Sequence, residues 1–337
     1  MVYSCALVCH LRTTTFCRTS QQILISRVQN QSVSDSAMFR RQLSSAVAAV
    51  SSRLKSDYDL CTLSVRSRDI DSFLCSLFLP STIRHHFIVL KALNLEIASI
   101  APARSASSHP ASMKFHFWRD LVDSCFANSP IQHPIARALH HSIYTLSLSR
   151  SYFDRMLHHR ENDLKSKQPE SLSALENYGI GTHGAILSLG LESLGYQKKE
   201  LIDTANHFGQ ALSLAILLRG TRHHAECGRV YLPLTLTSKY GLTSESLLRL
   251  QETDPLKEVT FRIADLARAH WDEGVRAANE SADKHQRKIF LQAAPTRIIL
   301  DRLQDVQFNP LHAKLMRDSR FSLSSYLVQC SVQGKIL

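Results

Sequence analysis

The segment ILLRGTRHHAECGRVYLP, residues 216–233, carries the most structural and functional information in this chain. It follows a run of apolar residues spaced by four, three, four and three positions, which predicts a helix with one buried face. That run consists of Leu201, Ala205, Phe208, Leu212 and Ala215. Within the segment, Gly220 and His224 lie four residues apart, so on a helix they share one side. A core helix therefore ends here with two positions that face the same way.

The composition is that of a globular, helix-rich protein. Of the 337 residues, 44% are hydrophobic and 20% are charged, with only 11 glycines and 10 prolines, which excludes collagen-like and disordered chains. A chain of this length folds as one large α domain or two smaller ones, with room for an enclosed pocket. No useful strand-like alternation and no repeat of about 20–50 residues appears. The expected fold class is all-α.

The net charge of +11 is unevenly distributed. Up to residue 56 there are seven basic residues and one acid, Asp35, so +6 lies in this stretch and +5 remains for the rest. A moderately basic body without Lys/Arg runs interleaved with aromatic residues does not indicate nucleic-acid binding. We therefore expect no nucleic-acid partner.

Neither cysteines nor apolar runs indicate a metal module or a membrane span. The eight cysteines are scattered without a CxxC pair, which argues against a zinc module or a disulfide framework and favours a reducing compartment. The longest apolar run, FIVLKALNLEIASI at residues 87–100, is interrupted by Lys91, Asn94 and Glu96 and falls short of the ~20 residues a spanning helix needs. A soluble or peripherally attached protein is expected.

The N-terminal region has the composition of a mitochondrial import signal. The stretch MFRRQLSSAVAAVSSRLKS, residues 38–56, is rich in Arg, Ser and Ala, lacks acids and is amphipathic as a helix. We expect residues 1–56 to be a targeting leader and residues 57–337 to be the folded domain. Because Met38 begins the basic stretch, translation starting there is an alternative. An ordinary first helix is the other interpretation.

The rest of the chain reads as helices joined by short loops. Short helices are expected at residues 69–80 and 135–146, and a longer one at residues 82–100 with Ser81 and Thr82 as capping candidates. The small polar residues 103–112 predict a loop.

Residues 171–196 predict a helix that contains Gly179, Gly181, Gly184 and Gly190. Each glycine costs roughly 1 kcal/mol in a helix, so close packing or a wall against a ligand should compensate.

The same segments, taken together, resemble the squalene/phytoene synthase family. In that family, the segment that corresponds to residues 216–233 has the sequence NILRDVGEDARRGRVYLP. Arg219 and residues 228–233 are identical at the aligned positions. Four further pieces resemble the family in order and spacing: RDIDSFLCSLFLP, FHFWRDLVD, HPIARAL and ENYGIGTHG. The resemblance implies an isoprenoid-synthase-like helical bundle around a central cavity.

The resemblance implies a site in which, in the family, two helices with DxxxD motifs bind magnesium ions that contact a prenyl diphosphate. Aspartates four apart on a helix face one way, and their carboxylates suit magnesium. Here the second motif falls on Gly220 and His224, and the first falls on Ala98 and Pro102 within LNLEIASIAP. No metal ligand and no cofactor is therefore expected.

Three family residues around the second motif are kept: Arg219 directly before it, and Arg229 and Tyr231 after it. Two interpretations remain open, a residual anion-binding site or a purely structural role. The acids Glu161 and Asp163, close to Arg160, are interpreted as a surface ion-pair cluster rather than a replacement metal site.

The segment ALNLEIASI, with Asn94, Glu96 and Ala98, is similar to the corresponding segment in a non-catalytic mitochondrial branch of the family, the complex I (NADH dehydrogenase) assembly factor 6 type. That resemblance implies an interaction protein of the matrix, peripheral to the inner membrane, with complex I subunits or other assembly factors as partners. The competing hypotheses are an active or residual prenyl-diphosphate-binding transferase, and a cavity that binds an isoprenoid or lipid without chemistry.

Overall fold

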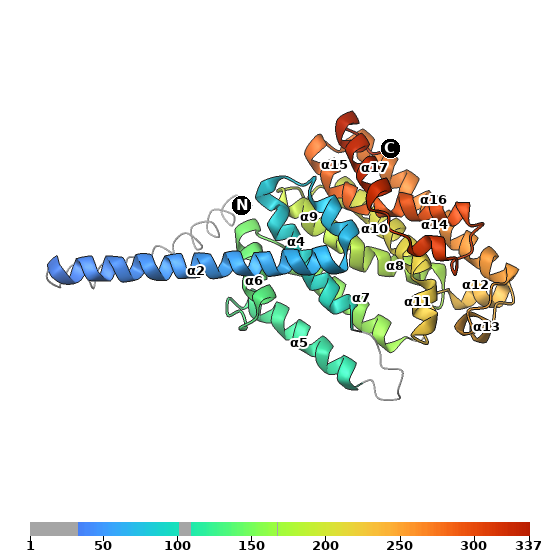
Figure 1. Cartoon of the computed structure of the whole chain (residues 1–337), viewed down its shortest axis with the longest axis horizontal. Coiled ribbons are helices and arrows are strands. Elements are labelled where there is room, and N and C mark those ends of the chain that lie inside the picture. Colours follow the sequence, from blue (N-terminus) through green and yellow to red (C-terminus); the bar gives the residue numbers. More distant parts are fainter. Residues whose placement is uncertain (1–32, 101–108, 167) are drawn as a thin grey trace, which may run out of the picture. The chain divides into compact units, whose positions relative to one another are not determined.

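A computed structural model describes residues 33–100, 109–166 and 168–337, and within these ranges it contains helices and no strand. Contacts divide the chain into two compact units, residues 1–57 and 58–337. The all-α prediction is confirmed, and Figure 1 shows how the helices of the larger unit surround α10. The elements in chain order are α2 (Val33–Arg68), α3 (Ile70–Ser76), α4 (Ser81–Ala98), α5 (His109–Phe126), α6 (Pro134–Leu146), α7 (Arg150–Lys165), α8 (Leu172–Gly179), η1 (Ile180–Gly184), α9 (Ala185–Ser193), α10 (Lys199–Arg219), α11 (Thr221–Glu226), α12 (Leu234–Lys239), α13 (Ser244–Leu248), α14 (Asp254–Ser281), α15 (Lys284–Phe290), η2 (Leu291–Ala293), α16 (Pro295–Asp305), η3 (Ala313–Met316) and α17 (Arg320–Gln333).

Helix α10 is the central element because nearly every side of it is covered. It packs against α14, α8, η1, α9 and α16. Its predicted apolar stripe is buried throughout, with Phe208 fully inside the core. The first half of α10 joins a core shared with α4, α6, α7 and α9, and its last turns join a second core with α14 and α16. The end of α10 thus lies between two packed groups of helices.

The glycine-rich stretch packs closely against α10. A Cβ at Gly209 would lie 2.3 Å from the backbone nitrogen of Gly184, so only glycine allows this approach. Instead of one continuous helix, the stretch divides into α8, the π-helical turn η1 and α9. A single π-helical turn shifts the side chains that follow it, and such turns are frequent at functional sites.

Two local predictions were wrong. Neither Ser81 nor Thr82 caps α4, which begins at Ser81 behind Pro80 without a side-chain cap. The predicted loop at residues 103–112 ends early, because α5 begins at His109, and Pro110 suits a first turn since that turn needs no backbone donor there. Residues 101–108 lie outside the described part of the chain. Within the described ranges, every helix is too short or too polar to cross a bilayer.

Candidate functional site

A cavity of about 530 Å³ lies where the ends of α4 and α10 meet α7, η1 and α11. The predicted site residues that line it are Ala98, Arg219, His224, Arg229 and Tyr231. Gly220 lies directly beside it, since a Cβ there would come within 2.6 Å of the His224 ring. Pro102 lies outside the described residues. The fold thus brings one position from each of the two predicted motifs to a single cavity.

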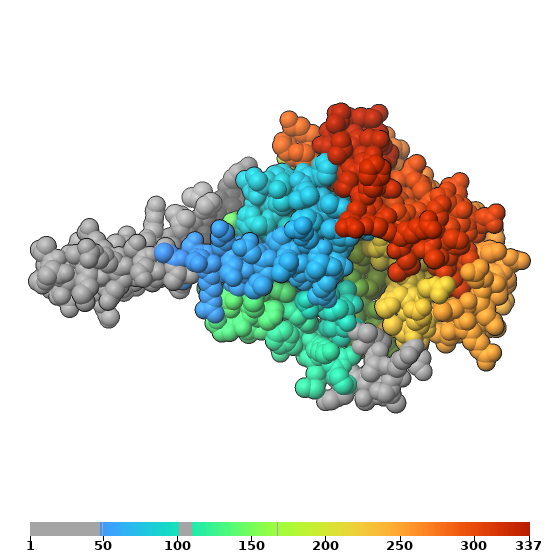
Figure 2. All heavy atoms as spheres, in the orientation of Figure 1, coloured from blue at the N-terminus to red at the C-terminus, as the bar shows by residue number. Residues whose placement is uncertain are grey.

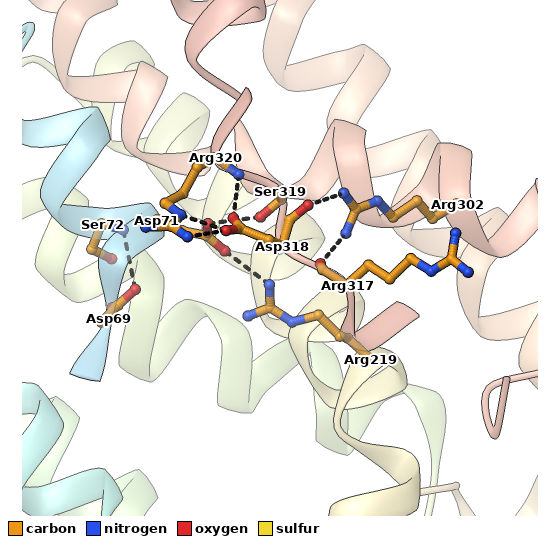
Figure 3. Close-up of polar contacts among 9 residues, drawn as sticks. All are labelled: Asp69, Asp71, Ser72, Arg219, Arg302, Arg317, Asp318, Ser319 and Arg320. Atoms are coloured by element: carbon orange, nitrogen blue, oxygen red, sulfur yellow. Dashed lines mark hydrogen bonds and ion pairs between the residues drawn. The ribbon is translucent and has the colours of Figure 1, made fainter. Parts of the chain in front are cut away.

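Arg219 is held by a buried carboxylate of α3. Its Nη1 donates to Oδ2 of Asp71 at 2.9 Å, and Asp71 is only 7% exposed. The other Asp71 oxygen accepts a hydrogen bond from the Ser319 hydroxyl at 2.9 Å. Figure 3 shows Asp71 between these two donors. Arg219 therefore ties α10 to α3, while Ser319 ties the start of α17 to the same carboxylate.

Arg229 and Tyr231 are both bound to Asp163 near the end of α7. Arg229 Nη2 donates to the Asp163 carboxylate at 3.0 Å and to the carbonyls of Asp163 and Ser166 at 2.8 and 3.1 Å. A cation near the last carbonyls of a helix is favourable. The Tyr231 hydroxyl donates to the second carboxylate oxygen at 2.8 Å. Burial raises the pKa of this phenol, and the neighbouring Asp163 raises it further, so the hydroxyl keeps its proton.

Arg160 also lines the cavity, a position that the sequence analysis did not predict for it. It turns inward from α7 and donates to the Tyr178 hydroxyl and, at 3.1 Å, to Oδ1 of Asn94. Its Nε is buried without an acceptor. In the described ranges no carboxylate pairs with Arg160, and residues 101–108 and 167 include no acid. The predicted surface cluster is therefore wrong for Arg160.

The other members of that predicted cluster have separate partners. Glu161 pairs with Arg119 and Lys165, whereas Asp163 pairs with Arg229. Because Glu161 and Asp163 are two residues apart on a helix, their carboxylates point to different sides of α7.

Two of the histidines that line the cavity, His183 and His224, are neutral groups. Burial is the main cause that lowers the pKa of His224 to about 4, followed by the charges of His223 and Arg229. Burial, then Lys91 and Arg160, holds the pKa of His183 well below its ordinary value. The Nδ1 atoms of both rings are buried without a partner. Neither ring carries charge near neutral pH, so both contribute polar but uncharged groups to the wall of the cavity.

The residues around the cavity do not fit the magnesium cluster that the resemblance implies. Among the described residues, two acids line it, Asp69 and Asp163. Asp69 accepts from the backbone of Ser72 at 3.1 Å as the N-cap of α3, and Asp163 is bound by Arg229 and Tyr231. Magnesium requires several free oxygen ligands in near-octahedral geometry. Across the described residues, no group of three or more His, Cys, Asp or Glu side chains could hold a metal ion.

The partners of the cavity arginines were not predictable from local spacing. Asp71 lies 148 residues before Arg219, and Asp163 lies 66 residues before Arg229. Arg160 lies three residues after Leu157, which the structure buries, but the sequence alone did not show that this side of α7 faces the cavity. The structure shows that this spacing puts Arg160 on the inner side of the helix, at the cavity.

Comparisons with known proteins agree with the geometry. The squalene/phytoene synthase family model matches residues 65–326. The "NADH dehydrogenase (ubiquinone) complex I, assembly factor 6" of Bos taurus is 30% identical, covering 79% of this chain and 80% of its own length. The protein of that name from Mus musculus is 28% identical over 85% of each chain.

Synthases of the family are also similar to this chain, at lower coverage or identity. A presqualene diphosphate synthase of Rhodopseudomonas palustris is 25% identical, covering 51% of this chain and 60% of its own length. The crystal structure of a dehydrosqualene synthase superposes with a TM-score of 0.73 at 17% identity, covering 83% of this chain and 97% of that one. On the match across residues 65–326, this chain belongs to the squalene/phytoene synthase family.

Proposed function

We propose that this chain is a non-catalytic assembly factor for mitochondrial respiratory complex I, built on the squalene/phytoene synthase fold. The observation that carries the proposal is how the cavity uses its charges. Arg219 and Arg229 are bound to Asp71 and Asp163, and the positions of the second motif hold Gly220 and a neutral His224. A cavity of this kind supports packing and partner binding better than the ionisation of a diphosphate.

The relatives support the choice of partner. Proteins named complex I assembly factor 6 are 28–30% identical to this chain over most of its length. We infer that complex I subunits or other assembly factors are the partners of this chain, and that it acts in the mitochondrial matrix, peripheral to the inner membrane.

The leader is part of the same proposal. Residues 1–56 carry seven basic residues and one acid, which supports removal of this stretch after import, with residues 57–337 as the mature domain. N-terminal sequencing of the mitochondrial protein tests this, and a mature chain that keeps residues before Met38 would contradict it.

The test of function is deletion of the gene in cells of the source organism. We expect fully assembled complex I, measured on native gels, to fall and to return when the full chain is expressed. As a matched control, rescue with the Lys199→Ala variant should succeed equally, because it removes only an exposed ion pair with Asp203 on α10. Normal complex I in the deleted cells, together with a loss of isoprenoid products, would instead support a transferase.

A second candidate function is binding of a prenyl diphosphate, isoprenoid or lipid in the cavity without a metal. One observation favours it: the Arg160 guanidinium faces the cavity without a carboxylate partner among the described residues. Comparing diphosphate binding by the full chain and by Arg160→Met tests this candidate, since only the parent should bind.

A further inference from the structure

A second, separate pocket lies between α15 and α17 and is lined by basic side chains. Its volume is about 250 Å³. Among the described residues that line it there is no acid, and the basic ones are Lys284, His285, Arg287, Lys288 and Lys335. This concentration of one sign of charge is independent of the cavity at the end of α10.

The lysines and arginines of this pocket are not neutralised by any side chain that the structure describes. In the part of the chain that the structure describes, none of its lysines and arginines forms an ion pair, and Arg287 Nε is buried without an acceptor. The neighbouring acid, Asp283, is occupied as the cap of α15 and as the acceptor of the Tyr196 hydroxyl at 3.1 Å. The stretches 284–300 and 319–337 contain no Asp or Glu at all. Their charge is therefore available to an anion from outside.

Next to the pocket, α17 exposes an apolar stripe. Phe321, Val328 and Val332 are 89%, 52% and 81% exposed, and their spacing of seven and four residues places them on one side of the helix. The opposite side, with Leu323 and Leu327, is buried in the core. Figure 2 shows α17, in red, along the surface of the larger unit.

An outward apolar stripe is unusual on a helix that already buries one face. Between the stripe residues, the outward positions Ser324, Ser325 and Gln329 are small or uncharged. No charge on this part of α17 opposes transfer of the stripe into an apolar environment.

We propose that α17 and the α15–α17 pocket form a docking surface for an anionic lipid bilayer. The stripe enters the boundary between headgroups and acyl chains, and the basic pocket binds lipid phosphate. Apolar insertion together with basic side chains is the combination by which peripheral proteins bind anionic membranes. A bilayer is favoured over a protein partner because the pocket offers cations and donors without a single acid. This inference rests on the proposed location at the inner membrane and identifies the surface of the protein that would contact the membrane.

The test is flotation of the full purified chain with lipid vesicles. One set is phosphatidylcholine, and in the other about a quarter of the lipid is anionic phosphatidylglycerol. We expect binding to the anionic vesicles, weakened by salt, and little binding to the neutral ones. Phe321→Ser with Val332→Ser, and separately Lys284→Gln with Lys288→Gln, should each weaken binding about tenfold or more, because two contacts are lost.

Matched variants elsewhere control for general effects. Met113→Ser with Phe117→Ser removes exposed apolar side chains from α5, and Lys198→Gln with Lys199→Gln removes exposed cations near α10. Both should bind vesicles as the parent does.

Three outcomes would overturn the inference: no binding to anionic vesicles, equal weakening by the control variants, or equal binding to neutral vesicles. A dimer that the α17 variants convert to monomer, with vesicle binding unchanged, would assign the stripe to a second copy of the chain and also overturn it. Failure of the proposed function appears elsewhere, as normal complex I in cells lacking the gene, so the two failures are distinguishable.

Discussion

The cavity at the end of α10 and the surface of α15 and α17 both gather basic side chains, but they treat the charge in opposite ways. In the cavity, Arg219 and Arg229 are each bound to a carboxylate of the same chain. On the α15–α17 surface, the described lysines and arginines of the pocket have no carboxylate partner. Charge neutralised inside the protein holds helices together, whereas charge left open is available to an outside partner. On the proposals above, the paired arginines of the cavity are structural and the α15–α17 surface binds an outside partner, while Arg160 is the cavity arginine without a carboxylate among the described residues.

The largest effect is expected from removal of Asp163. Asp163→Ala leaves Arg229, whose side chain is 13% exposed, without its carboxylate and Tyr231 without its acceptor. The free energy of unfolding in urea should fall by about 3 kcal/mol. As a control, Lys199→Ala breaks an ion pair whose side chains are 85% and 51% exposed and should leave the midpoint unchanged. Equal effects of the two variants would remove the distinction between internal and open charge.

Replacement of each arginine by methionine sharpens the same distinction within the cavity. Arg229→Met leaves the Asp163 carboxylate without a cation and should destabilise the protein by about 2–3 kcal/mol. Arg160→Met removes a cation that has no carboxylate and leaves two neutral acceptors, so it should cost about 1 kcal/mol or less. Urea unfolding of both variants checks the difference, and a larger loss for Arg160→Met would contradict it.

His224 should give the cavity a pH dependence. Its pKa in the folded chain is about 4, against 6.5 for the free side chain, because burial disfavours the charged ring. As pH falls below 6.5 the unfolded chain binds the proton first, so the contribution of His224 is intact above 6.5 and is lost as pH falls through 4. Between pH 7 and pH 5 this loss should be about 2 kcal/mol. In urea titrations at the two pH values, His224→Gln should lose less stability than the parent; equal losses would assign the dependence to other groups.

The smallest effect is expected at the residue that joins the two regions. Ser319 donates to Asp71, the same carboxylate that binds Arg219. Ser319→Ala removes one hydrogen bond while the ion pair remains, so the cost should be about 1 kcal/mol. That corresponds to about 2–4 °C in the melting temperature of a domain of this size. A loss as large as that of Asp163→Ala would mean that the α17 anchor, rather than the cavity, carries the stability.

The sequence predicted the helices well where an apolar stripe was long. The pattern through Phe208 and Leu212 marked α10, because burial of one face dominates such a helix. Boundaries were predicted poorly where a single residue decides, as at Ser81 and His109. A local preference cannot show which donors the tertiary structure leaves uncapped.

The site was predictable in its positions but not in its contacts. Resemblance to the family placed Ala98 and His224 together, and the structure brings both to one cavity. The pairing of Arg219 with Asp71, and the inward turn of Arg160, depend on which helices meet in three dimensions. Charge counts along the chain do not contain that information, so the free and the neutralised arginine could not be distinguished beforehand.

The most direct test of the central claim is calorimetric titration of the full chain with farnesyl diphosphate, with and without magnesium. The account predicts that magnesium produces no increase in binding, because Asp163 is occupied and the second motif offers Gly220 and a neutral His224. Magnesium-dependent binding accompanied by product formation would contradict it and would identify the chain as a working prenyltransferase.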